Sequence, residues 1–125
     1  KTGNHIRIAD YKTGKTEPND LRYKAGDPIF EDPGQQKKLQ LLWYAFIYLS
    51  HYKEEVPEVQ SGIISLRNIS EGFQPIRIAK AKTVDLSLLE EFDQGLNSIL
   101  RDIFNPHLPF EQNPDPKYNT LLTAW

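Results

Sequence analysis

An acid and an amine stand close together near the start of the chain, at Asp10 and Lys12. They follow two isoleucines at alternate positions, and alternate side chains of a strand lie on one face. The spacing predicts a strand over residues 6–12 in which the two charges share one face, roughly 6 to 7 Å apart. Gly14 then permits a turn that leaves the pair at the end of the strand.

A carboxylate at a strand end is a hard oxygen ligand for Mg²⁺, and an ammonium group beside it can orient a water or offset charge on a phosphate. The pair therefore indicates metal-assisted phosphodiester hydrolysis. The spacing alone is weak evidence, because the tail carries the same triplet at Asp115, Pro116 and Lys117. A chance match is the alternative, and the neighbouring sequence has to decide between the two.

Residues 7–14 resemble the second half of the PD-(D/E)XK nuclease signature, in the RecB-like branch of that superfamily. About 25 residues further on, Gln40 and Tyr44 are similar to the Gln-x-x-x-Tyr helix motif that follows this strand in the branch. The resemblance implies a DNA nuclease that depends on Mg²⁺ or Mn²⁺. It also implies a repair or recombination enzyme, often an exonuclease, that can be joined to a helicase domain or subunit.

The resemblance also assigns roles. Asp10 is expected to bind the metal, the Tyr11 carbonyl to complete its shell, and Lys12 to act on the attacking water. Gln40 and Tyr44 are expected to support the substrate. We expect nucleic acid to be contacted as well by Lys15, on the segment that follows the strand.

Two departures from the family pattern affect activity. The family has a further acidic metal ligand on the preceding strand, but none of the nine residues before Asp10 is acidic. The chain has no Cys, so the iron-sulfur cluster of several relatives is not expected. It also has no Met, which favours a C-terminal fragment of a longer nuclease domain, inactive or nearly so in isolation.

The composition fits one globular domain over residues 1–125, with 38% hydrophobic and 26% charged positions. The longest apolar run, residues 41–49, is shorter than the roughly 20 residues that span a membrane. No membrane partner is expected, and the absence of Cys is compatible with a cytoplasmic protein. A net charge of −2 argues against a protein that coats nucleic acid by bulk electrostatics. Basic residues in 1–24, 35–53 and 77–82 either converge near Asp10 or form ordinary solvated faces.

The pattern of apolar residues predicts an α/β fold: a partial restriction-endonuclease-like core with a small sheet and two long helices. Residues 13–34 are expected to form a long loop, either mobile near the site or a tolerated insertion. The expected elements are a helix over 35–52, a hairpin of strands 59–67 and 73–79, a helix from Asp85 or Ser87 to Phe104, and a Pro-rich tail over 105–125. The first helix is predicted to bury Leu39, Leu42, Trp43, Phe46 and Leu49, and the second Leu88, Leu89, Phe92, Leu96, Ile99, Leu100 and Ile103.

Two other functions remain open. The chain is either a nuclease-like module that no longer cuts and binds nucleic acid or a protein partner, or an unrelated α/β interaction domain. The last reading predicts no contact between the Gln40 helix and the Asp10 strand.

Overall fold

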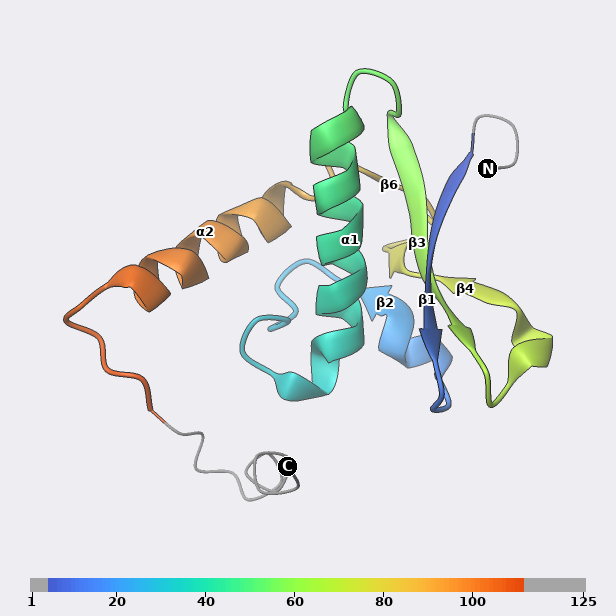
Figure 1. Ribbon diagram of the computed structural model, residues 1–125, viewed down its shortest axis with the longest axis horizontal. Coiled ribbons are helices and arrows are strands. Elements are labelled where there is room, and N and C mark those ends of the chain that lie inside the picture. The colour runs from blue at the N-terminus through green and yellow to red at the C-terminus, as the bar shows by residue number, and fades with distance from the viewer. Residues whose placement is uncertain (1–4, 112–125) are drawn as a thin grey trace.

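The structure is a computed structural model that describes residues 5–111 (Figure 1). Its first strand, β1 (Ile6–Lys12), confirms the strand predicted from the alternating sequence. Every second side chain along it, Asp10 and Lys12 included, is half-buried, and the side chains between them are exposed. The pleat therefore turns both charged residues to the side of the strand that carries the isoleucines.

The main sheet is built around β3 (Glu58–Ser65), most of whose side chains are buried. β1 pairs with β3 in parallel along its whole length, from Ile6 opposite Val59 to Lys12 opposite Ser65. The other edge of β3 pairs antiparallel with β4 (Phe73–Pro75) and β6 (Val84–Asp85). A parallel pair needs a crossover connection, and the helix α1 (Gln36–Tyr52) lies in the one between β1 and β3. A small sheet with two helices gives the mixed α/β fold that the sequence predicts.

The predicted hairpin forms between β3 and β4, but its second strand is shorter than predicted. After β4, β5 (Arg77–Ile78) leaves the main sheet and pairs in parallel with β2 (Arg22–Tyr23). This small second sheet buries Tyr23 and Ile78 in the core. The break in the predicted strand therefore depends on a partner that is distant in the sequence, which local periodicity does not reveal.

α1 (Gln36–Tyr52) packs on the sheet through Leu41, Leu42, Ala45 and Leu49, which are buried (Figure 1). The predicted buried stripe is only partly correct. Leu42 and Leu49 are buried, Leu39 and Phe46 are half-buried, and the Trp43 side chain is 39% exposed. The reason is that α1 has a second apolar neighbour besides the sheet: Trp43 and Phe46 contact the ring of Phe92.

α2 (Glu90–Phe104) begins after a turn in which the Asp85 carboxylate accepts hydrogen bonds from the Ser87 hydroxyl at 2.6 Å and the Leu88 amide at 2.9 Å. Its buried stripe is shorter than predicted. Leu89 and Phe92 are buried, whereas Leu100 and Ile103 are 40% and 46% exposed. Figure 1 shows the cause, because α2 runs away from α1 and from the sheet as it proceeds.

The segment predicted as a long loop, residues 13–34, is packed against the rest of the chain. It contains the 3₁₀ helix Pro18–Leu21 and β2, and it ends within a second 3₁₀ helix, Pro33–Gln35. Leu21 and Ile29 are buried in the core together with Tyr23 of β2. Single apolar residues among Pro, Gly and Asp thus anchor the segment without a periodic pattern. Of the predicted tail over 105–125, residues 112–125 lie outside the described part.

Candidate active site

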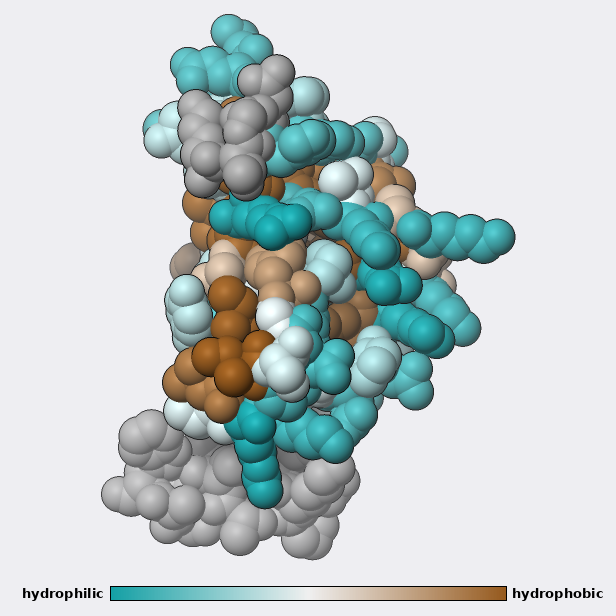
Figure 2. All heavy atoms as spheres, turned by 90° about the vertical axis from the view of Figure 1, so that its right-hand side faces the viewer, coloured by the Kyte–Doolittle hydropathy of each residue, from teal (hydrophilic) through white to brown (hydrophobic). Residues whose placement is uncertain are grey.

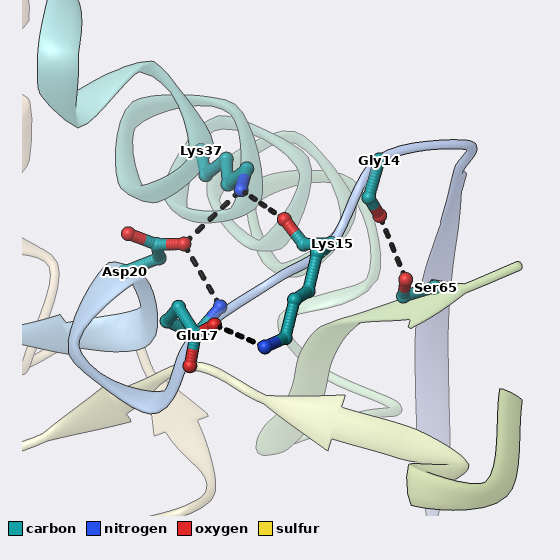
Figure 3. A network of polar contacts seen from close by, with 6 residues as sticks. All are labelled: Gly14, Lys15, Glu17, Asp20, Lys37 and Ser65. Carbon is teal, nitrogen blue, oxygen red and sulfur yellow. Dashed lines mark hydrogen bonds and ion pairs between the residues drawn. The ribbon is translucent and has the colours of Figure 1, made fainter. Parts of the chain in front are cut away.

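Asp10 and Lys12 lie side by side at the end of β1. The Lys12 Nζ is 3.0 Å from the Asp10 Oδ2, and the two side chains are 32% and 18% exposed. The turn after β1 is held by two bonds from β3 and the residue after it: the Leu66 amide donates to the Lys12 carbonyl at 2.8 Å, and the Ser65 hydroxyl to the Gly14 carbonyl at 2.7 Å (Figure 3). The pair is therefore placed at a fixed sheet margin and remains partly open to solvent.

α1 contributes the next two polar groups. The Lys12 ammonium donates a hydrogen bond to the Gln40 Oε1 at 2.7 Å, and the Gln40 Nε2 donates to the Tyr44 hydroxyl at 2.7 Å. Gln40 and Tyr44 are one helical turn apart, so both face β1. The unrelated interaction domain predicts no contact between this helix and the strand, and the bond from Lys12 contradicts it.

Asp10 offers an oxygen that suits a metal ion. Its Oδ2 is buried and accepts no hydrogen bond of good geometry, although it lies close to Lys12. The Lys12 ammonium already offsets the charge of this oxygen, and carboxylate oxygens are also the ligands that Mg²⁺ prefers. Within residues 5–111 no three His, Cys, Asp or Glu side chains come together as a metal-binding group. Asp10 thus suits a metal ion, but the described residues do not supply a complete set of metal ligands.

The side chain of Tyr11 points away from this pair. It is 67% exposed, on the opposite face of β1 from Asp10 and Lys12. Because its main-chain carbonyl belongs to the same strand end, the carbonyl rather than the phenol is the group that suits the predicted role.

Lys15 does not join the pair. Its Nζ is 2.9 Å from the Glu17 Oε1, and the hydrogen bond and charge of Glu17 raise the pKa of Lys15 above its ordinary value (Figure 3). No hydrogen bond or ion pair connects it to Asp10 or Lys12 in the described structure. The Lys15 carbonyl instead accepts a bond from Lys37, at 3.2 Å.

Convergence of the basic segments near Asp10, one of the two readings that the sequence leaves open, is not seen for the lysines at the start of α1. Lys37 pairs with Asp20 at 3.1 Å, and Lys38 pairs with Asp27 at 3.4 Å. Burial raises the pKa of Asp20, but the Glu17 amide and Lys37 outweigh it and lower that pKa overall. These two lysines hold the 13–34 segment against α1, a role that sequence reasoning missed.

An apolar groove of about 460 Å³ continues from Asp10 along α1. Tyr44, Tyr48 and Tyr52 line it, with the rings of Tyr48 and Tyr52 4.7 Å apart. Gln40, Tyr44 and Tyr48 recur at intervals of four in the sequence, and this spacing alone places Tyr44 and Tyr48 of the lining on one face of the helix. Continuing the same interval by one step would have found Tyr52.

A family model described as the PD-(D/E)XK nuclease superfamily matches residues 1–118 of the chain. The chain therefore belongs to the PD-(D/E)XK nuclease superfamily. Searches of curated proteins and of solved structures returned no match. Membership gives nuclease chemistry and a DNA substrate as the general class, in agreement with the sequence prediction. No helix in residues 5–111 is long and apolar enough to cross a membrane.

Proposed function

We propose that the chain is part of a Mg²⁺-dependent deoxyribonuclease of the RecB-like branch, with Mn²⁺ as the alternative ion. The observation that carries the proposal is the connected set of side chains from Asp10 through Lys12 and Gln40 to Tyr44. A carboxylate that can bind a metal ion and an ammonium that can act on water or phosphate are groups used in phosphodiester hydrolysis, and the helix-borne amide holds the ammonium in place. Belonging to a nuclease superfamily supports the same reaction.

Each group has a role that follows from its position. The Asp10 carboxylate and the Tyr11 carbonyl would hold the metal ion, which when bound supplies a Lewis acid and lowers the pKa of a water. Lys12 orients the attacking water or offsets charge on the phosphate, because its ammonium keeps an N–H group beyond those directed at Gln40 and Asp10. Gln40 fixes the Lys12 ammonium, and Tyr44 fixes the Gln40 amide. Neither acts on the substrate directly in this scheme.

Further parts of the proposal rest on the resemblance. The chain is the C-terminal portion of a nuclease domain, and an acid on the preceding strand of the parent completes the metal shell. The parent acts in DNA repair or recombination in the cytoplasm, as an exonuclease associated with a helicase. Lys15 is proposed to reach DNA only if its pair with Glu17 opens, since that pair is exposed to solvent.

The test uses the parent domain that includes the segment before residue 1. Asp10→Ala and Lys12→Ala are expected to lower Mg²⁺-dependent DNA cleavage by a factor of about 100 or more, because each removes a charge that acts on the transition state. The matched control is Asp115→Ala with Lys117→Ala, the same triplet in the Pro-rich tail, which should cleave normally. Circular dichroism checks that every variant folds. Full activity of both site variants would refute the proposal.

The second candidate is a module that binds DNA without cutting it. It is favoured by one observation: within residues 5–111 Asp10 belongs to no group of three His, Cys, Asp or Glu side chains, and it lies beside the Lys12 ammonium. This candidate expects the parent domain to bind DNA with no cleavage at any Mg²⁺ or Mn²⁺ concentration. Any metal-dependent cleavage that Asp10→Ala abolishes excludes it.

A further inference from the structure

Two arginines lie next to each other in the small second sheet. Arg22 of β2 is paired in register with Arg77 of β5, and both side chains are exposed. Neighbouring strands are about 4.8 Å apart, so the two side chains leave the sheet at that separation. Like charges in such a position repel each other and destabilise the pair unless an anion lies between them.

The two arginines border a hollow of about 470 Å³, to which Lys82 contributes a third cation. Glu71 is the acidic residue in its lining. No ion pair or side-chain hydrogen bond is present for Arg22, Arg77 or Lys82 within residues 5–111. By contrast, the lysines near β1 and at the start of α1 each lie close to a carboxylate: Lys12, Lys15, Lys37 and Lys38.

The positive charge extends toward β4. Phe73 also lines the hollow, and the guanidinium of Arg7 lies over its ring, 5.2 Å from the centroid. Figure 2 views the molecule from the side where β1 and β4 lie, and long hydrophilic side chains project from much of that surface. A nucleic-acid backbone that crosses the hollow toward β4 would therefore also meet the Arg7 guanidinium.

We propose that this hollow binds a phosphate of the nucleic-acid backbone, at a point separate from the Asp10 pair. A guanidinium presents two parallel N–H groups to one phosphate, and two such groups side by side can hold it from both sides. An ion bound there also relieves the repulsion between Arg22 and Arg77. The choice of nucleic acid as the phosphate source rests on the proposed function.

Binding is tested with the 125-residue chain and fluorescently labelled DNA over a series of salt concentrations. Arg22→Gln with Arg77→Gln is expected to weaken binding about tenfold or more and to lower the slope of log K against log salt by about 1 to 2. Arg101→Gln, an exposed arginine in the last turn of α2, is the matched control and should leave both unchanged. Unchanged affinity and slope in the double variant overturn the proposal.

Thermal unfolding gives a readout that does not depend on DNA. Inorganic phosphate at constant ionic strength should raise the melting temperature of the wild-type chain more than that of the double variant. If phosphate raises the melting temperature of the wild-type chain and of the double variant equally, the proposed phosphate site is wrong. If phosphate protects selectively but the DNA affinity and slope do not change, the hollow is a small-anion site and the nucleic-acid proposal is wrong.

Cleavage separates this site from the catalytic one. In the parent domain the double variant should cut normally at saturating DNA, whereas Asp10→Ala should bind DNA through the hollow without cutting it. A double variant that is folded and binds DNA normally but cannot cut would contradict the inference alone. Full activity of Asp10→Ala and Lys12→Ala would contradict the proposed function, but it would not affect the proposal that the hollow binds phosphate.

Discussion

Gly62, in the middle of β3, has no room for a side chain. A Cβ at this position would lie 2.4 Å from the Gln74 carbonyl oxygen and 2.8 Å from the Phe73 ring. Since Gln74 presents backbone there, the clash cannot be relieved by a rotamer change. Gly62→Ala should therefore force β4 away from β3 and lower the free energy of unfolding by about 1 to 3 kcal/mol, measured by urea denaturation.

The matched control is Gly14→Ala, in the turn after β1. No atom lies within 4 Å of the Cβ that this change adds. The free energy of unfolding should change by less than about 0.5 kcal/mol. An equal, small effect at both glycines would mean that β3 and β4 are not as close as the structure places them.

The site residues that could be predicted from sequence are those whose type and order carry the information. Asp10 and Lys12 share a face because a strand alternates, and Gln40 and Tyr44 share one because a helix repeats. The contact between Gln40 and Lys12 confirms that the two motifs meet, although their catalytic roles stay predictions. Lys15 is expected to contact nucleic acid; in the structure an acid two residues away in the sequence pairs with it, and its role stays a prediction.

At the scale of elements, Phe92 is the residue of α2 that lies fully buried in the core. Phe92 is 1% exposed, and its ring lies within 5.4 to 6.3 Å of the rings of Phe30, Trp43 and Phe46. Phe92→Ala should lower the free energy of unfolding by about 3 to 5 kcal/mol, because it leaves a cavity among these rings. Chemical denaturation, monitored by tryptophan fluorescence, measures this change in the free energy of unfolding.

Phe104, at the end of the same helix, provides the comparison. It is 81% exposed, so Phe104→Ala should change the stability by less than about 0.5 kcal/mol. If Phe92→Ala and Phe104→Ala lower the free energy of unfolding by the same amount, α2 is not held to α1 through Phe92.

Element positions were easier to predict than their buried faces. The bounds of β1 and α1 follow from periodicity and from Gly and Pro at the ends. The faces depend on what packs against them: Trp43 has α2 as a neighbour instead of the sheet, and Leu100 lies where α2 has moved away from α1. Apolar spacing identifies a stripe but not the length over which a partner covers it.

At the scale of the whole molecule, alkaline pH should reveal the core position of Tyr23. Burial raises the pKa of its phenol to about 12, and the charge and hydrogen bond of Glu91 act in the same direction. The folded state therefore keeps the proton at a pH where the unfolded chain loses it. The protonated phenol therefore contributes fully to the free energy of unfolding below about pH 10. That contribution, roughly 2 kcal/mol, is lost as the pH rises toward 12.

Urea unfolding of the wild-type chain and of Tyr23→Phe at pH 8, 10 and 11 measures this effect. The variant should lose less stability over that range, because its ring has no proton to give up. A parallel decline in both proteins would mean that Tyr23 ionises as freely in the folded state as in the unfolded chain.

Long-range organisation was the part least accessible to sequence. The pairing of β2 with β5 and the ion pairs of Lys37 and Lys38 join segments that no local pattern relates. These contacts turn the predicted loop over 13–34 into a packed part of the domain. Charge counts along the chain likewise identify basic segments without identifying their acidic partners.

β1 is the outermost strand of the main sheet, paired with β3 on one edge within residues 5–111. Its other edge can accept backbone hydrogen bonds from an added strand. Alternate side chains of such a strand would project beside Asp10, about 5 Å away, on the side that faces α1. A single acid in that register would bring a second carboxylate to the first without any movement of Lys12 or Gln40.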